Sequence, residues 1–304
     1  MTKTALFVGD VSLDLTMVVD HVPAPDEKVH VDQAIEGPGG VVGNAAVACA
    51  RAGASVRILI QTGDDAAASL VIAGMEAKGV AVEAHPVEGR TCRVVSIIEP
   101  HGEKRLLLDP GVSMYPGQHA VEVVELSNVD WVHTAVYGPS AERLVERARL
   151  AGIPWSLDLE PASFKAGIGT LSAMIDGAAV IFCNERAAAA IGPDAVNMLL
   201  KLGARAVVRT LGPTGARLLA ADADILASPP QIGRVVDTTG AGDCLAGWFI
   251  GETLLGASRQ TALAMAVSAA SLSCGNLGAQ DSFPDRNDVV KACPPADAAA
   301  TNRE

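Results

Sequence analysis

The sequence predicts an α/β fold with a mostly parallel central sheet. Short apolar runs alternate along the chain with longer segments of helical periodicity, which is the pattern of repeated βαβ units. A glycine follows each clear helical segment, where a residue without Cβ can take the left-handed conformation that ends a helix. Of the 304 residues, 49% are hydrophobic and 19% are charged, which excludes wholesale disorder and supplies a core for one large domain or two ordinary ones.

The clearest apolar runs are expected to be buried strands, and the segments between them to be helices. The strands are expected at 5–8, 56–60, 131–134, 155–159, 180–183 and 206–210. The helices are expected at 43–52, 67–78, 141–151 and 194–202, which end near Gly53, Gly79, Gly152 and Gly203 respectively.

Two regions break this alternation. Residues 16–35 and 91–109 show strand-like alternation with no helix between the strands, and the second region contains a turn at 100–102. Together they predict a small antiparallel sheet that projects from the main one, although two surface hairpins without a function would give the same pattern. The composition of the tail, 294–304, is typical of a frayed end.

Charge and composition argue against several classes of protein. The net charge of -12 makes a nucleic-acid or membrane-surface role improbable, because such surfaces bind basic proteins. The longest uncharged stretch, 260–280, is rich in alanine and serine and is expected to be a buried soluble helix rather than a membrane span. The six cysteines show no C-x-x-C spacing, so we expect reduced thiols and a cytoplasmic protein.

The most informative stretch is 237–243, Asp-Thr-Thr-Gly-Ala-Gly-Asp, which leads from a strand into an apolar helical run. Such a turn aims backbone N–H groups at one point, at the positive end of a helix dipole, where a phosphate fits. Asp243, in the first turn, could accept a proton from an attacking hydroxyl. An ordinary helix cap is the alternative role for Asp243, but it does not explain the second acid, Asp237, and the two threonines in the same turn.

Better-known catalytic motifs are missing from the sequence. It contains no G-x-x-x-x-G-K-[ST], no G-x-G-x-x-G, no H-E-x-x-H and no G-x-S-x-G. The sequence therefore gives no support to a P-loop nucleotidase, a Rossmann dehydrogenase, a zinc hydrolase or a serine hydrolase.

A second glycine-rich segment, 37–44, also leads into a helix. Its adjacent glycines, Gly39 and Gly40, would let the backbone approach a small ligand, and Asn44 can both donate and accept a hydrogen bond to a hydroxyl. A tight turn before a helix is consistent with the same pattern.

Taken in order, these motifs resemble the ribokinase-like carbohydrate kinases, also called the PfkB family. The matching segments are Gly39-Gly40-x-x-x-Asn44, Gly63-Asp64-Asp65, 237–243 and 278–282. The resemblance implies a three-layer α/β/α sandwich with a mainly parallel central sheet and a small β-sheet lid, formed by 16–35 and 91–109 within a kinase domain spanning 1–293. It also implies transfer of the ATP γ-phosphate to a hydroxymethyl group of a small sugar or nucleoside, with Mg²⁺, and a homodimer formed through the lid.

The resemblance assigns roles to individual residues. Asp243 falls where the family has its general base, and Gly240, Ala241 and Gly242 where it has an anion hole for the moving phosphoryl group. The residues expected to face the sugar hydroxyls are Ser12, Asp14, Gly39, Gly40 and Asn44.

The same resemblance implies a nucleotide site and a cation site. The residues expected along ATP are Asn184, Thr210, Gly212, Gly215 and Gly242. Those at positions that hold a potassium ion in many relatives are Asp237, Thr239, Ser273, Asn276, Gly278 and Ser282.

The chain departs from the family pattern at two places. Relatives have N-x-x-E on the nucleotide side, whereas this segment ends in Ala187, and Glu185 does not share a helix face with that position. Mg²⁺ is still expected, because a triphosphate must be neutralised before a hydroxyl can approach it. Ribokinases also place a glutamate against ribose where this chain has Tyr137 and Gly138.

A sugar of ribose or fructose type is the favoured acceptor. A nucleoside would favour aromatic stacking partners, and the lid segments supply almost none. A nucleoside kinase remains the alternative within the same chemistry. A sugar or nucleotide sensor that has lost turnover is a second alternative, which Ala187 favours and an intact Asp243 opposes.

Overall fold

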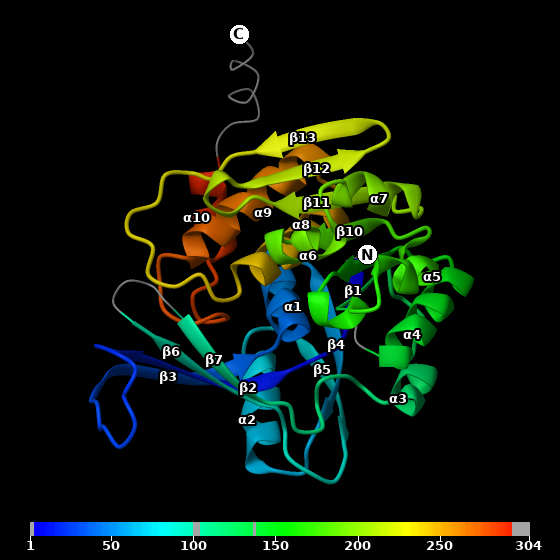
Figure 1. Ribbon diagram of the computed structural model, residues 1–304. Helices are drawn as coiled ribbons and strands as arrows, with labels where there is room; N and C mark the ends of the chain where they lie inside the picture. Colours follow the sequence, from blue (N-terminus) through cyan, green and yellow to red (C-terminus); the bar gives the residue numbers. More distant parts are fainter. Residues whose placement is uncertain (1–2, 100–103, 136–137, 294–304) are drawn as a thin grey trace.

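A nine-stranded sheet forms the centre of the protein (Figure 1). The computed structural model describes residues 3–99, 104–135 and 138–293. The strand order is β13-β12-β11-β10-β9-β8-β1-β4-β5, parallel from β11 to β5, with β12 and β13 antiparallel at one edge. The strands are β1 (Thr4–Val8), β4 (Ser55–Thr62), β5 (Ala81–Pro86), β8 (Trp131–Ala135), β9 (Trp155–Asp158), β10 (Val180–Cys183), β11 (Ala206–Thr210), β12 (Ala216–Ala220) and β13 (Ala223–Ala227).

Helices cover both faces of this sheet and divide the core into two apolar clusters. One face carries α1 (Val41–Arg51), α2 (Ala66–Glu76), α8 (Ala241–Leu254), α9 (Arg259–Ser273) and α10 (Arg286–Ala292). The other carries α3 (Gln118–Val123), α4 (Gly138–Leu150), α5 (Ser172–Ile175), α6 (Glu185–Ile191) and α7 (Ala195–Lys201). This three-layer arrangement confirms the predicted fold class. No helix in the described part of the chain is both long and apolar enough to cross a membrane.

All six predicted strands and the four helices predicted between them are present, with ends shifted by a few residues. The helix expected at 260–280 is also present, as α9, but it ends at Ser273. The glycines expected to end the helices have positive φ, from 69° at Gly152 to 100° at Gly53 and Gly203. Three strands were not expected, namely β5, β12 and β13. β5 and β13 are the two edge strands, and β12 is the antiparallel neighbour of β13. All three are only partly buried, so they lack the continuous apolar run that marks a central parallel strand.

A second sheet of four strands forms the lid, in the order β3-β2-β6-β7. Its strands are β2 (Ser12–Val19), β3 (Val31–Gly39), β6 (Arg93–Ile98) and β7 (Lys104–Asp109). Antiparallel pairing holds for β2 with β3 and for β6 with β7, whereas β2 and β6 run parallel. Both of these strands leave the carboxyl edge of the main sheet and run outward, so the lid is a mixed sheet. The predicted turn at 100–102 and the tail at 294–304 lie outside the described residues.

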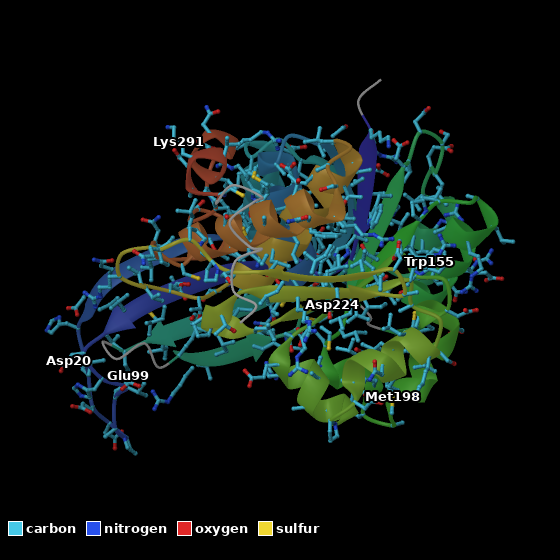
Figure 2. The ribbon with its side chains drawn as sticks, turned by 90° about the horizontal axis from the view of Figure 1, so that it is seen from above. Asp20, Glu99, Trp155, Met198, Asp224 and Lys291 are labelled. Carbon is cyan, nitrogen blue, oxygen red and sulfur yellow. The ribbon has the colours of Figure 1, made fainter. Side chains whose placement is uncertain are left out.

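The lid projects to one side of the main sheet, and in Figure 2 Asp20 and Glu99 lie together at its far end, away from Trp155 and Met198. The Gly63-Asp64-Asp65 segment fixes its attachment. Asp65 caps α2 by accepting from Ala68 N (3.1 Å) and also accepts from Thr91 Oγ1 (2.7 Å), just before β6. This motif therefore links the end of β4 to the start of a lid strand.

Helices α1 and α8 pack closely because two glycines of α8 face α1. A Cβ on Gly247 would lie 2.2 Å from Ala45 O, and one on Gly251 would lie 2.6 Å from Ala52 Cβ. Since protein cores are close-packed, neither position has room for a methyl group unless the helices separate.

Gly247→Ala is expected to lower the free energy of unfolding by about 1–3 kcal/mol, because the added methyl group would push α8 away from α1. Urea unfolding of both proteins measures this difference. Gly169→Ala is the matched control, since a Cβ there meets no heavy atom within 4 Å. Equal stability of the two variants would contradict the close packing at Gly247.

Candidate active site

Asp243 lies in the first turn of α8, where the sequence predicts a general base. Asn44 of α1 donates from Nδ2 to Asp243 Oδ2 (2.7 Å). Gln280 Nε2 in turn donates to Asn44 Oδ1 (3.2 Å), which fixes the orientation of the amide. The structure thus brings together Asn44 and Asp243, and adds Gln280, which the sequence analysis did not single out.

The carboxyl group of Asp243 is poised near neutral pH. Burial raises its pKa to about 7, and the negative charges of Asp10, Glu160 and Asp14 add to the shift, whereas the hydrogen bond from Asn44 lowers it. A carboxylate with a pKa near the working pH is well suited to accept a proton from a hydroxyl.

Asp14 faces this site from the lid strand β2. Ser12 Oγ donates to Asp14 Oδ1, and burial raises the pKa of Asp14 to about 6. A Cβ on Gly39, in the paired strand β3, would lie 2.1 Å from Asp14 Oδ2, so a larger residue here would displace the Asp14 carboxylate from this position. Ser12, Asp14 and Gly39 therefore form one group on the lid.

Asp10, at the end of β1, holds the glycine-rich segment in place. Its carboxylate accepts from Val41 N (2.9 Å) and Val42 N (3.1 Å), the first N–H groups of α1. Gly40 has φ +94°, and a Cβ there would lie 2.6 Å from Asp10 O. The glycine at this position is thus required by the close approach of two backbone segments.

The start of α8 forms an open N-terminus. Gly240 has φ +74°, and Ala241 N donates to Thr238 O (3.3 Å) in a turn that leads into the helix. A Cβ on Gly242 would meet no heavy atom within 4 Å. Space beside the free N–H groups of a helix start is the setting in which a phosphate binds.

The loop before this helix packs against the segment after α9. Asp237 Oδ1 accepts from Thr239 N (2.9 Å) and Thr239 Oγ1 (2.6 Å), and Asp237 Oδ2 accepts from Gly278 N (3.0 Å). Ser273 and Ser282 are buried but donate to carbonyl groups of their own segment, and Asn276 is exposed. Of the six residues expected around a cation, three are joined by hydrogen bonds, since Thr239 and Gly278 both donate to the carboxylate of Asp237.

An ammonium group already lies at this acid. Lys104 Nζ, from the lid strand β7, donates to Thr239 Oγ1 (2.7 Å) and lies 4.0 Å from Asp237 Oδ1. Carboxylate and hydroxyl oxygens suit a potassium ion, but here they already have a cationic neighbour.

The expected nucleotide residues lie at the carboxyl ends of β10 and β11. Asn184 caps α6 by accepting from Ala187 N (2.8 Å). The segment after Thr210 turns back so that Leu211 N donates to Gly215 O (2.8 Å), and Gly212 and Gly215 have positive φ.

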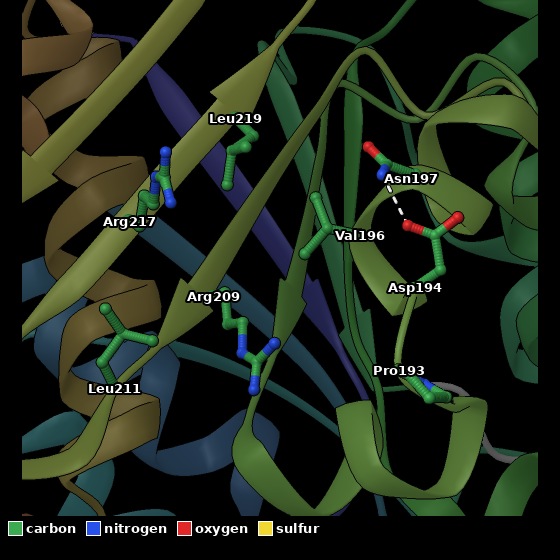
Figure 3. Close-up of a pocket in the computed structure, with 8 residues that line it drawn as sticks. All are labelled: Pro193, Asp194, Val196, Asn197, Arg209, Leu211, Arg217 and Leu219. Carbon is green, nitrogen blue, oxygen red and sulfur yellow. Dashed lines mark hydrogen bonds between the residues drawn. The ribbon is translucent and has the colours of Figure 1, made fainter.

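A pocket of about 260 Å³ lies beside this segment, between α7 and the strands β11 and β12 (Figure 3). It is lined by Pro193, Asp194, Val196, Asn197, Arg209, Leu211, Arg217 and Leu219.

Ala187, which stands in place of the family's usual acid, is fully buried in the core, and Glu185 is exposed. Acidic groups come instead from the end of β9. The pKa of Asp158 is raised well above its usual value, first by burial and then by the charge of Asp243. Glu160 also has a raised pKa because of burial, partly offset by Arg186. Among the described residues, no group of three or more His, Cys, Asp or Glu side chains is arranged to hold a metal ion.

Asp10, Asp158 and Glu160 were missed by the sequence analysis. Each is at or just beyond the carboxyl end of a central parallel strand, where ligands bind in open α/β sheets, and this position was the available signal. At the second departure from the family, Tyr137 lies outside the described residues and Gly138 begins α4.

A carboxylate that can take a proton from a hydroxyl, next to an anion-binding helix start, is what transfer of a phosphoryl group to an alcohol requires. Fold and site together thus define a phosphotransferase with an alcohol acceptor. The model of the pfkB family carbohydrate kinase matches residues 2–286, and the chain belongs to this family. The protein is therefore a carbohydrate kinase.

Several curated relatives match over most of their length. The chain is 28% identical over 288 residues to ribokinase of Bacillus subtilis, a match that covers 93% of this chain and 96% of the relative. It is 27% identical over 299 residues to ATP-dependent ribose-1-phosphate kinase of Halopiger xanaduensis, covering 97% and 96%.

Solved structures show the same fold. Ribokinase of Thermotoga maritima superposes with a TM-score of 0.81 at 25% identity, covering 96% of this chain and 99% of that one. Arabidopsis thaliana ribokinase, complexed with ribose and ATP, gives a TM-score of 0.82 at 23% identity with the same coverage. Escherichia coli phosphofructokinase-2, in complex with potassium, gives 0.78 at 22% identity, covering 96% and 98%.

The pH dependence of kcat/KM should report the pKa of the Asp243 carboxyl group. Its pKa in the folded protein is about 7, so the carboxylate form dominates only above that pH. Below it, kcat/KM is expected to fall about tenfold per pH unit. Glu160→Gln removes a neighbouring negative charge and should move the midpoint to lower pH. A midpoint near the usual carboxyl value in the unmodified protein would contradict this assignment.

Proposed function

We propose that this protein transfers the γ-phosphate of ATP to a hydroxymethyl group of a small sugar of ribose or fructose type. The observation that carries the proposal is the contact between Asn44 and Asp243, which sets a base with a near-neutral pKa at the open N-terminus of α8. The relatives named ribokinase and ribose-1-phosphate kinase support a ribose-like acceptor.

In this proposal Asp243 takes the proton of the acceptor hydroxyl as its oxygen attacks the γ-phosphorus, and Asn44 keeps the carboxylate aimed at that hydroxyl. The N–H groups at Gly242 and its neighbours bind the oxygens of the transferred phosphoryl group, whose negative charge they stabilise. Ser12 and Asp14 hold the remaining sugar hydroxyls from the lid. By excluding water from the site, the lid would favour transfer of the phosphoryl group to the sugar over hydrolysis of ATP.

Magnesium enters this proposal together with ATP. Mg²⁺ in kinases is held mainly by phosphate oxygens and water with one or two carboxylates, so no cage of protein ligands is needed. Asp158 and Glu160, which interact electrostatically with Asp243, are the carboxylates that we assign to this ion. When bound, it neutralises phosphate charge. Glu160 thereby supplies the acid that is missing at Ala187.

Nucleotide binding is assigned to Asn184, Thr210, Gly212, Gly215 and Gly242 as the resemblance implies. A sugar is preferred over a nucleoside, because the described lid strands contain no Phe, Tyr or Trp that could stack on a base. We also place the enzyme in the cytoplasm, since four of its six cysteines, Cys49, Cys92, Cys183 and Cys244, are free thiols buried in the core.

ADP release from Mg-ATP should be measured across ribose, ribose 1-phosphate, fructose, other ketoses, sugar acids and nucleosides. One class of sugar is expected to give turnover, and Asp243→Asn should lower kcat about 10²–10⁴-fold while keeping the fold. Glu185→Gln is the matched control, because this acid is exposed outside the cluster.

If only a nucleoside gives turnover, the protein is a nucleoside kinase rather than a sugar kinase. If no acceptor gives ADP release but ATP still raises the melting temperature, the result would instead favour a sugar or nucleotide sensor without turnover. Asp243→Asn with full activity would remove the base from the mechanism.

We also propose that two copies associate through the lid. Strand β7 is an edge strand, and its leucines Leu106, Leu107 and Leu108 are 58%, 62% and 56% exposed. Consecutive residues of a strand point to opposite faces, so apolar side chains are exposed on both faces of this edge. A second copy of the lid would cover them.

A homodimer is therefore expected in sedimentation equilibrium. Leu106→Lys combined with Leu107→Lys places charge on both faces of β7. The double change should raise the dissociation constant of the dimer at least about tenfold. Leu150→Lys is the control, since Leu150 is 78% exposed on α4, outside the lid. A monomeric unmodified protein, or a dimer that survives the double change, would contradict this interface.

A further inference from the structure

The loop that precedes the anion hole carries a buried negative charge. The side chain of Asp237 is only 2% exposed, and its carboxylate accepts hydrogen bonds from Thr239 and Gly278. Burying an ionised carboxylate costs free energy unless a positive charge or several donors compensate it. The next residue after Thr239 is Gly240, so whatever stabilises this acid also shapes the start of α8.

The positive charge comes from the lid. Lys104 is the first residue of β7, and its ammonium donates to Thr239 Oγ1, whose own proton is donated to Asp237 Oδ1. The ammonium is 4.0 Å from Asp237 Oδ1, and the lysine side chain is 25% exposed. Lys104, Thr239 and Asp237 therefore form a chain of contacts from the lid to the loop.

An ammonium ion and a potassium ion resemble each other, because both carry one positive charge and both are held by oxygen atoms. A potassium ion at this loop would meet the lysine ammonium as a like charge close by, which is unfavourable. The described residues thus do not fit a potassium ion in this state of the lid.

We infer that the Lys104 ammonium takes the place of a monovalent cation at the Asp237 loop, so that the enzyme works without potassium. Lys104 is a positioning residue, because it acts on the anion hole through Thr239 and Asp237 and touches no reacting atom. Since it belongs to the lid, the loop receives this charge when the lid lies against it. This inference rests on the proposed kinase function.

Small ions can reach the loop. A cavity of about 470 Å³ lies between the lid and residues 234–238, and Lys104, Asp237 and Leu277 are part of its lining. Removing the lysine side chain would enlarge this space beside a buried carboxylate, which would then be open to K⁺ from solution.

The test compares unmodified protein, Lys104→Ala and Lys28→Ala in Tris buffer with and without saturating KCl. KCl should change the kcat of the unmodified protein by less than about twofold. Without K⁺, the kcat of Lys104→Ala should be at least about tenfold lower than that of the unmodified protein, and K⁺ should restore most of this loss. Lys28 is the matched control, since it is an exposed lysine of the lid.

A second readout needs no turnover. K⁺ should raise the melting temperature of ligand-free Lys104→Ala, and not that of the unmodified protein, because an ion that binds only the folded state stabilises it. Choline chloride controls for ionic strength.

Activation of the unmodified enzyme by K⁺ of about tenfold or more would overturn the inference and leave the kinase proposal intact. A loss of kcat in Lys104→Ala that K⁺ does not reverse, together with a melting temperature that K⁺ does not raise, would also overturn the inference. Absence of turnover with every acceptor, with the effect of K⁺ on melting as expected, would count against the kinase proposal alone.

Discussion

The close packing of α1 against α8 brings together two segments of the chain that lie 199 residues apart, Asn44 and Asp243. Gly247 and Gly251 permit this approach, because any larger side chain would collide with the backbone or side chains of α1. Each helix begins at a glycine-rich turn at the carboxyl edge of the sheet. Consequently the two turns meet at one place, and the proposed base, its orienting amide and the proposed anion-binding helix start all depend on one helix pair.

Electrostatics gives this place its chemical character. Asp10, Asp14, Asp158, Glu160 and Asp243 lie near enough to influence one another, and burial raises the pKa of each. Such a cluster is unfavourable until a cation enters. Some stability is therefore given up in the free protein, which is a common feature of sites that bind charged ligands, and the Mg²⁺ ion proposed above would supply the opposite charge.

Much of this could be predicted from the sequence, and the limits have physical reasons. The central strands are continuous apolar runs and the helices end at glycines, so both are visible as local patterns. The strands β5, β12 and β13, at or next to the edges of the sheet, are only partly buried and carry no such signal. The parallel pairing of β2 with β6 was missed for a different reason, since the register between distant strands is set by three-dimensional packing.

The same distinction applies to the site. The turn at 237–243 and the segment at 37–44 are local motifs, so Asp243 and Asn44 were found, although the contact between them was not. Gln280 and Lys104 gain their significance only from residues far away in the chain. Asp158 and Glu160 became visible once the carboxyl ends of the strands were placed side by side.

The lid contains part of the proposed sugar site rather than only covering it. Ser12 and Asp14 lie on β2, and Gly39, which makes room for Asp14, lies on β3. A sugar bound as proposed would thus contact the lid through Ser12 and Asp14 and the main domain through Asp243. Any opening of the lid would break its contacts to the sugar, so the residence time of the sugar and of its phosphorylated product would depend on how fast the lid opens.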